Sequence, residues 1–222
     1  MSTEHAPFDV ERARFNMIEQ QIRPWDVLDP AVLSLLSSVH REDFVPEAHR
    51  AQALMDLEIP LDNGRSLLAP RVEARLVQDL SLAKEETALL IGAATGYMAA
   101  LMAHLAQRVV AIDSDATLVS AARANLKKAG IGNVEVAQAD GTQGYPGQAP
   151  YDAILLANAG VSRLQLDLSD LPTLVLDPTE FVPAPAQGVL GLQVRAADQQ
   201  TQQVLSQLNH PEVAAKIALE RG

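Results

Sequence analysis

The sequence predicts an α/β fold built around a parallel sheet. Short apolar runs recur from residue 87 onward, and the first three end in a glycine or an aspartate. Stretches of ten or more residues with helical spacing separate the first three runs. Strands that alternate with helices of this length form βαβ units, whose strands run parallel. The 222 residues, 48% hydrophobic and 20% charged, suffice for one large domain, or one domain plus a small appendage, with a substantial core.

The N-terminal third of the sequence has the pattern of helices. Apolar residues recur at helical spacing over residues 10–58, and Asp29 followed by Pro30 is typical of an N-cap and first helical residue. Pro46 is expected to close this block. A turn-rich connection over residues 59–64 then leads to a helix around residues 72–80.

From residue 88 onward, the pattern predicts the strands of the sheet and the helices that connect them. The predicted strands cover residues 88–91, 109–112, 134–136 and 151–156, with helices over 97–107 and 116–128. The apolar stretch 89–106 nearly reaches the length of a membrane span, but a glycine turn interrupts it, so we expect a buried strand, a turn and a buried helix. Functional residues of a parallel sheet lie at the carboxyl ends of its strands.

Three of these strand ends carry candidate ligand-binding residues. Gly92 to Gly96 form a small-residue turn that opens into a helix, where backbone N–H groups are available to a ligand. Asp113 ends the second strand about 20 residues later, at the spacing of an acid that binds ribose hydroxyls. Asp140 and Gly141 follow the third strand. Together they favour a nucleoside cofactor, either a nicotinamide nucleotide or S-adenosylmethionine.

Each of these features also has a structural interpretation. The small residues of the turn would permit close packing, Asp113 would cap the following helix, and Asp140-Gly141 would form a turn. The residues alone leave these alternatives open.

Composition excludes several classes of function. The net charge of −11 argues against binding nucleic acid or an anionic membrane. The absence of cysteine removes disulfides, thiolate metal sites and cysteine nucleophiles. The five histidines lack metal-ligand spacing, so we expect no metal. The first residues lack the basic and apolar regions of a signal peptide, so we expect a cytoplasmic protein.

Residues 10–157 resemble the protein-L-isoaspartate O-methyltransferase family of class I, S-adenosylmethionine-dependent methyltransferases. The matching segments are residues 17–22 (MIEQQI), 41–46 (REDFVP), 91–97 (IGAATGY), 140–145 (DGTQGY) and 149–152 (APYD). The resemblance implies a Rossmann-like methyltransferase fold with S-adenosyl-L-methionine as cofactor. It implies that Gly92, Ala94 and Gly96 line the methionine end of this cofactor. Asp113 would hold the ribose hydroxyls, and Asp140 and Gly141 would border the adenine.

Three residues depart from that family's pattern. Leu90 stands where the family usually has an acid, and Ala94 where it has its middle glycine. Leu68 stands where the family has a serine that contacts the isoaspartyl substrate, and leucine cannot hydrogen-bond a carboxylate. Ser66 retains a hydroxyl nearby and is the candidate substitute.

Residues 151–222 resemble a fragment of hydroxymethylbilane synthase, also called porphobilinogen deaminase. The matching segments are residues 152–164 (DAILLANAGVSRL), 181–195 (FVPAPAQGVLGLQVR), 208–210 (LNH) and 218–221 (ALER). That family attaches a dipyrromethane cofactor to a cysteine and binds carboxylates through arginines of an N-terminal part that is missing here. The activity of that family is therefore excluded. Residues 188–195 have the character of a strand and are expected to complete the sheet.

These observations predict three regions. Residues 1–80 form an N-terminal helical extension and substrate segment, 81–157 a cofactor-binding βαβ core, and 158–222 an atypical C-terminal third. The predicted function is S-adenosylmethionine-dependent methylation of a protein or peptide carboxylate. The alternative is a catalytically inactive, methyltransferase-like binding or structural protein. The sequence leaves the methyl acceptor and the oligomeric state open.

Overall fold

A computed structural model describes residues 9–62, 64–142 and 144–156, all of them within one of the two units into which the chain divides. A four-stranded sheet has the order β5-β4-β3-β6, and every neighbouring pair is parallel. The strands are β3 (Thr87–Ile91), β4 (Arg108–Asp113), β5 (Val134–Gln138) and β6 (Ala153–Leu155). The α/β class and the parallel sheet predicted from the sequence are therefore confirmed.

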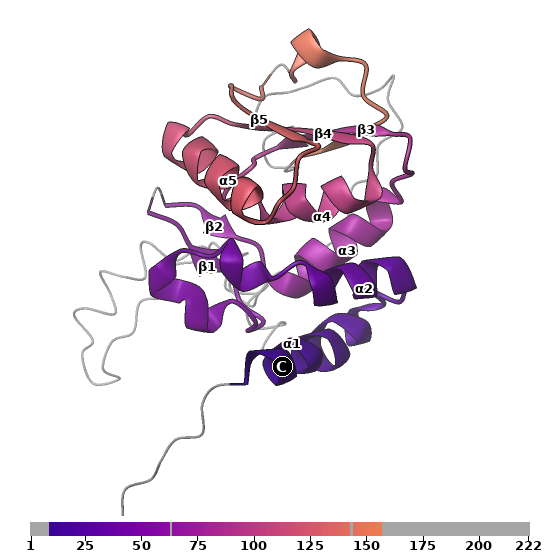
Figure 1. Ribbon diagram of the computed structural model, residues 1–222, viewed down its shortest axis with the longest axis vertical. Coiled ribbons are helices and arrows are strands. Elements are labelled where there is room, and N and C mark those ends of the chain that lie inside the picture. Colours follow the sequence, from indigo (N-terminus) through magenta and orange to yellow (C-terminus); the bar gives the residue numbers. More distant parts are fainter. Residues whose placement is uncertain (1–8, 63, 143, 157–222) are drawn as a thin grey trace, which may run out of the picture. The chain divides into compact units, whose positions relative to one another are not determined.

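Two helices connect the first three strands and lie on one face of the sheet (Figure 1). They are α4 (Tyr97–Leu105) and α5 (Ala116–Lys128). Asp115 caps α5, because its side chain accepts hydrogen bonds from the backbone N–H groups of Thr117 and Leu118. No helix within the described ranges is long and apolar enough to cross a membrane, so the stretch 89–106 is a strand, a turn and a helix as predicted.

The N-terminal part is helical and packs below α4 and α5 in Figure 1. Its α-helices are α1 (Val10–Asn16), α2 (Pro30–Ser38) and α3 (Pro70–Leu80), with a π-helical segment η1 (Met17–Ile22) and 3-10 turns η2 (Arg23–Trp25), η3 (Arg41–Asp43) and η4 (Glu47–Gln52). Asp29 caps α2 through the N–H of Ala31 at 2.7 Å, as the Asp-Pro pair predicts. Pro46 does not end the helical block. It precedes η4, because its backbone accepts the first bond of that turn, from the His49 N–H.

The connection before α3 is a small hairpin rather than an irregular turn. Strands β1 (Ile59–Pro60) and β2 (Ser66–Leu67) pair antiparallel, with Pro60 opposite Ser66. The Leu61 N–H donates to the Arg65 carbonyl at 2.7 Å and closes the loop between them. Sequence patterning gave no signal for these strands because each has only two residues.

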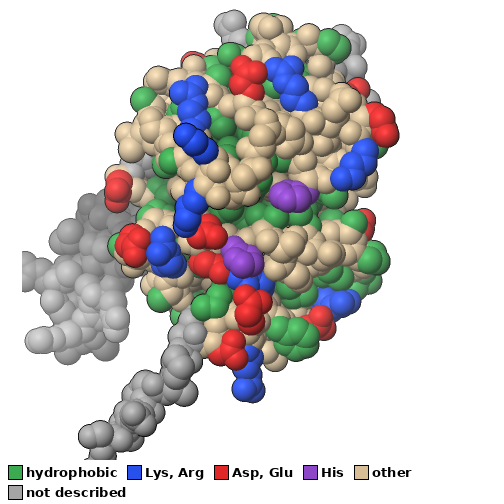
Figure 2. Space-filling view, viewed as in Figure 1, with side chains coloured by type: hydrophobic (Ala, Val, Ile, Leu, Met, Phe, Trp, Pro, Cys, Tyr) green, Lys and Arg blue, Asp and Glu red, His purple; other side chains and the backbone are tan. Residues whose placement is uncertain are grey.

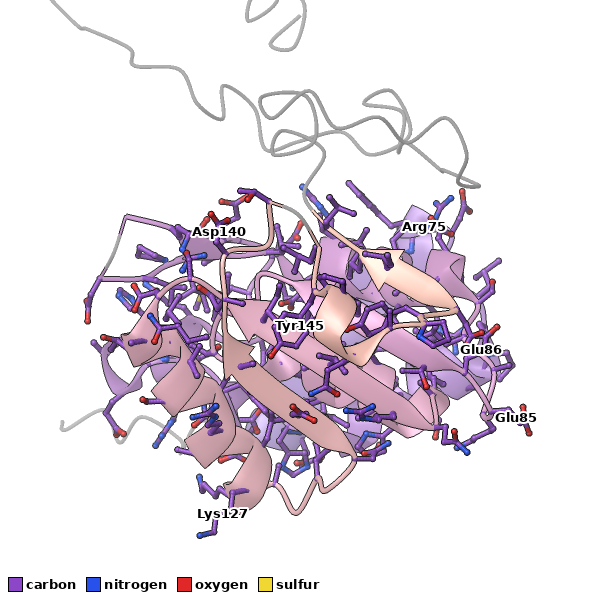
Figure 3. All side chains as sticks on the ribbon, turned by 90° about the horizontal axis from the view of Figure 1, so that it is seen from above. Arg75, Glu85, Glu86, Lys127, Asp140 and Tyr145 are labelled. Atoms are coloured by element: carbon purple, nitrogen blue, oxygen red, sulfur yellow. The ribbon has the colours of Figure 1, made fainter. Side chains whose placement is uncertain are left out.

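Both faces of the central strands are buried, which explains their continuous apolar runs. In β3 and β4, Leu90 and Val109 face the main core with α4, α5 and the N-terminal helices, whereas Leu89 and Val110 face a second cluster. Tyr145 and Tyr151 pack against this second cluster, and Figure 3 shows Tyr145 over that face of the sheet. The two central strands are thus buried on both faces, whereas Ile154 of β6, which pairs with Leu89, is 42% exposed.

Trp25 packs against helix α3. Its ring lies under the guanidinium of Arg71 on α3, with Cζ 4.3 Å from the ring centroid. It therefore belongs to the interface between the N-terminal helices. The predicted C-terminal third, residues 158–222, lies outside the described residues, as does nearly all of the segment that resembles hydroxymethylbilane synthase.

Candidate functional site

The carboxyl ends of β3, β4 and β5 meet at one edge of the sheet, because these strands are parallel and in register. This edge brings together the glycine turn after β3, Asp113 at the end of β4, and Asp140 after β5. Figure 3 shows the two ends of the sheet: Asp140 lies at the carboxyl end, and Glu85 and Glu86, which precede β3, lie at the opposite end. The sequence-predicted residues therefore share one edge.

The turn after β3 holds three residues in the left-handed backbone region. The φ angles are +101° at Gly92, +46° at Ala94 and +96° at Gly96. Gly92 is exposed, and a Cβ added to it would have no heavy atom within 4 Å, so a ligand can approach its backbone. A Cβ on Gly96 would lie 3.2 Å from the Ala122 Cα, which explains the glycine by close packing of α4 on α5.

The methyl group of Ala94 packs against the rest of the protein at this turn. It is partly buried and packs against the main core, while its N–H donates to the Asp113 Oδ2 at 3.0 Å. Alanine nevertheless carries a conformational cost at this φ, because its Cβ crowds the backbone in the left-handed region. Alanine in place of the family's glycine at position 94 therefore costs backbone strain.

Asp113 is the most deeply buried charged group of the edge, with no exposed side-chain surface. Its Oδ1 accepts from the Asp115 N–H at 3.0 Å and from the Arg65 Nη2 at 2.6 Å. Its Oδ2 accepts from Ala94, and the Arg65 Nη1 lies at 3.4 Å. Asp113 is therefore not the N-cap of α5, a role that Asp115 has, but the residue that connects the turn, β4 and the hairpin.

Asp140 and Gly141 form the third strand end. Asp140 is exposed, and its Oδ1 accepts from the Thr142 N–H at 3.1 Å, which is the turn geometry anticipated for Asp-Gly. A Cβ on Gly141 would overlap the Cγ2 of Ile91, so only glycine lets this loop lie against the end of β3. The turn uses one carboxylate oxygen of Asp140 and leaves the side chain open to solvent.

The predicted substrate segment lies between the hairpin and α3. Ser66 is exposed, and its hydroxyl donates to the Glu58 Oε2 at 2.7 Å across the hairpin. Leu68 is 38% exposed, whereas Leu90 on β3 is 3% exposed within the core. An acid at position 90 would face apolar neighbours, so leucine fits the packing of this strand.

A buried arginine that sequence analysis did not identify as functional holds this segment in place. Arg41 donates from Nη2 to the Leu68 carbonyl at 2.6 Å and from Nη1 to the Ala53 carbonyl at 2.6 Å. Its Nε donates to the Glu73 Oε2 at 2.8 Å. Burial raises the pKa of Glu73, and the neighbouring Arg41 charge opposes that shift. The sequence carries no local signal for this role, because Arg41 is followed by the charged residues Glu42 and Asp43.

The same arginine reaches the start of α4. Its Cζ lies 5.7 Å from the centroid of the Tyr97 ring, and Tyr97 directly follows Gly96. Burial raises the pKa of the Tyr97 phenol, whose hydroxyl has no hydrogen-bond partner among the described residues. Arg41 therefore links the substrate segment to the helix that begins at the glycine turn.

Within the described ranges, no group of three or more His, Asp or Glu side chains is placed to hold a metal ion. On the face shown in Figure 2, acidic and basic side chains lie next to one another rather than in a patch of one sign. Lys128 and Asp43 form an exposed ion pair at 2.8 Å.

An open parallel sheet with a glycine turn after one strand and acids at the next two strand ends is typical of a Rossmann-like fold. Solved structures of class I methyltransferases share this fold. The chain is similar to a protein-L-isoaspartate O-methyltransferase structure, with a TM-score of 0.55 and 25% identity over 65% of this chain and 46% of that one. A Plasmodium falciparum structure described as a putative member, in complex with S-adenosyl-L-homocysteine, has a TM-score of 0.51 at 18% identity and covers 68% of this chain and 78% of that one.

The model of the protein-L-isoaspartate(D-aspartate) O-methyltransferase family matches residues 12–164, and the chain belongs to that family. Two relatives bear its name. Protein-L-isoaspartate O-methyltransferase 1 of Rhodopseudomonas palustris is 40% identical over 72% of this chain, and the enzyme of Herpetosiphon aurantiacus is 38% identical over 72%. The matches span 64% and 72% of the lengths of these relatives.

Proposed function

We propose that this protein binds S-adenosyl-L-methionine at the carboxyl edge of the sheet and transfers its methyl group to a carboxylate of a protein or peptide. The observation that carries the proposal is the open space above exposed Gly92, in a turn whose neighbouring strand ends supply Asp113 and Asp140. Membership of the family and the names of its relatives support the choice of cofactor and acceptor.

Each candidate residue has a defined part in this proposal. The backbone of Gly92, Ala94 and Gly96 would line the methionine end, Asp113 would accept hydrogen bonds from the ribose hydroxyls, and Asp140 and Gly141 would border the adenine. The bound cofactor supplies an electrophilic methyl group on sulfur. The protein needs to align an acceptor oxygen with it and to exclude water, and no covalent enzyme intermediate is required.

Calorimetric titration with S-adenosyl-L-homocysteine tests the cofactor, with NAD as the control nucleotide. We expect heat from the first ligand and none from the second. An Asp140→Ala variant, which loses one exposed turn hydrogen bond, should bind several-fold more weakly with only a small decrease in its unfolding midpoint. A folded protein that gives heat with neither ligand would contradict the cofactor assignment and favour the inactive, methyltransferase-like alternative.

Leu68 tests the acceptor. We expect the Leu68→Ser variant to methylate an isoaspartyl peptide faster than the unaltered protein, because a hydroxyl at this position can hydrogen-bond the acceptor carboxylate. Leu68 is 38% exposed, so the change removes little packing.

A matched control is Leu28→Ser, at a leucine that is 59% exposed and lies before α2. Transfer of labelled methyl groups to isoaspartyl and aspartyl forms of one peptide would be measured for all three proteins. Equal rates for Leu68→Ser and the control would remove position 68 from acceptor recognition. Ser66 is tested in the same assay, since Ser66→Ala should lower transfer if its hydroxyl contacts the acceptor.

A cytoplasmic location stays a prediction, which cell fractionation would test.

A further inference from the structure

The side chain of Arg65 crosses from the hairpin to the candidate cofactor site. Arg65 lies in the loop between β1 and β2, just ahead of Ser66, and it pairs with an aspartate 48 residues further along the chain. Its Nη2 lies 2.6 Å from the Asp113 Oδ1. The two partners differ sharply in burial, because the Arg65 side chain is 43% exposed and that of Asp113 is 0% exposed.

The carboxylate of Asp113 has no surface left for a further hydrogen-bond donor in this arrangement. Its oxygens accept the N–H groups of Ala94 and Asp115, each at 3.0 Å, in addition to the guanidinium. Ribose hydroxyls that bind such an acid are donors to the same two oxygens. One of the donors present must therefore leave before a ribose can bind.

Arg65 is the donor that can leave at the lowest cost. The N–H groups of Ala94 and Asp115 are fixed by the glycine turn and by the start of α5, so moving either one would disturb the backbone. The guanidinium sits at the end of a flexible side chain that is nearly half exposed, and water can replace the hydrogen bonds it gives up.

We propose that Arg65 competes with the ribose of the cofactor for Asp113 and thereby makes cofactor affinity depend on the β1–β2 hairpin. In the absence of cofactor, Arg65 neutralises the buried carboxylate and ties the hairpin to the end of β4. Cofactor binding displaces the guanidinium and releases the hairpin, which leads directly into Ser66 and Leu68. Arg65 is thus a positioning residue that acts through Asp113, and the inference rests on the proposed function.

Competition and a merely structural role predict opposite changes in ligand affinity for the same substitution. Arg65→Gln should lower the urea midpoint of the free protein, because it removes the partner of a buried charge. If Arg65 competes, the same change should tighten S-adenosyl-L-homocysteine binding by roughly tenfold, since one charged hydrogen-bonded pair no longer has to be broken. If Arg65 only supports the fold, both stability and affinity should fall.

The matched control is Arg23→Gln. Arg23 is also 43% exposed and pairs with a carboxylate, Glu19, at 2.8 Å, but its partner lies only four residues earlier, in the adjoining segment η1. Calorimetric titration of the full chain and both variants with S-adenosyl-L-homocysteine gives the affinities. Hydrogen exchange of residues 59–67, with and without this ligand, gives a second readout: we expect faster exchange on binding in the unaltered protein and no ligand effect in Arg65→Gln.

The outcomes separate the two proposals. Binding that is unchanged or weaker in Arg65→Gln, with the unaltered protein binding normally, overturns the competition and leaves the proposed function standing. Hairpin exchange that slows on binding also overturns it. Absence of heat with the unaltered protein and with both variants, all of them folded, overturns the proposed function and this inference together.

Discussion

Ala94 occupies a backbone conformation that glycine adopts more readily. At φ +46° its Cβ crowds the neighbouring backbone, at a cost of roughly 1–2 kcal/mol in the left-handed region. We expect Ala94→Gly to raise the free energy of unfolding by about 1 kcal/mol, the gain being reduced by the greater freedom of glycine in the unfolded chain. Urea unfolding would measure it.

The matched control for this prediction is Ala124→Gly on the exposed face of α5. The same chemical change there should lower stability by about 1 kcal/mol, because glycine is a poor helix former. Destabilisation by both variants would show that the strain at position 94 is relieved in solution.

Tyr97 gives a pH dependence whose sign follows from its burial. Its pKa is raised above the usual 10.0, so the folded protein keeps the phenol neutral where the unfolded chain ionises. The stability contribution of the neutral phenol is complete below pH 10 and is lost as the pH rises above it, at about 1.4 kcal/mol per pH unit.

Tyr97→Phe should remove this part of the alkaline loss of stability. At neutral pH the variant should match or exceed the original stability, since the buried hydroxyl has no partner among the described residues. Urea unfolding at pH 8 to 11 would measure the difference between the two proteins. A difference that stays constant over this range would contradict the raised pKa.

At the scale of elements, Arg41 connects four separate parts of the chain. Its guanidinium binds Glu73 of α3 and the carbonyls of Ala53 and Leu68, and it lies over Tyr97 of α4. Arg41→Met leaves a buried carboxylate and two carbonyls without their donor, which should cost about 3–5 kcal/mol.

Glu73→Gln keeps an acceptor for Arg41 and both carbonyl bonds. It should therefore cost less than Arg41→Met, about 1–2 kcal/mol by urea unfolding. An equal loss of stability in the two variants would assign the stabilisation to the ion pair. It would then not come from the hydrogen bonds that Arg41 donates to the Ala53 and Leu68 carbonyls.

The elements that the sequence predicted are those that follow from local pattern. Strands β3 and β4 are apolar along their whole length because both faces are buried, and α5 begins after an N-cap. The edge that gathers Gly92, Asp113 and Asp140 followed from strand direction alone. The roles of these residues toward a cofactor stay predictions, as do those of Ser66 and Gly141.

The contacts that the sequence did not predict join residues far apart along the chain. Arg41 meets Glu73 across 32 residues, and Arg65 meets Asp113 across 48. Nothing in the local pattern of either arginine distinguishes it from a solvated charge. Such pairs depend on how the N-terminal helices and the hairpin dock on the sheet, which hydrophobic periodicity does not specify.

At the scale of the molecule, the N-terminal helices and the sheet share one hydrophobic core. The main cluster extends from Met17 through Leu36 and Val77 to Leu101 and Val136, without a boundary between a helical extension and a βαβ core. Its buried surface is therefore common to the first two predicted regions. A shared core favours unfolding of these parts in one cooperative transition.

Trp25, the single tryptophan, makes this cooperativity measurable. It stacks on Arg71 of α3 and is not among the proposed cofactor-binding residues. If the helices and the sheet unfold together, a ligand at the edge of the sheet must shift the transition seen at Trp25. With S-adenosyl-L-homocysteine at 100 times its dissociation constant, we expect the free energy of unfolding followed by tryptophan fluorescence to rise by about 2.7 kcal/mol. A Trp25 transition that stays unmoved, while calorimetry shows binding, would mean that the N-terminal helices unfold on their own.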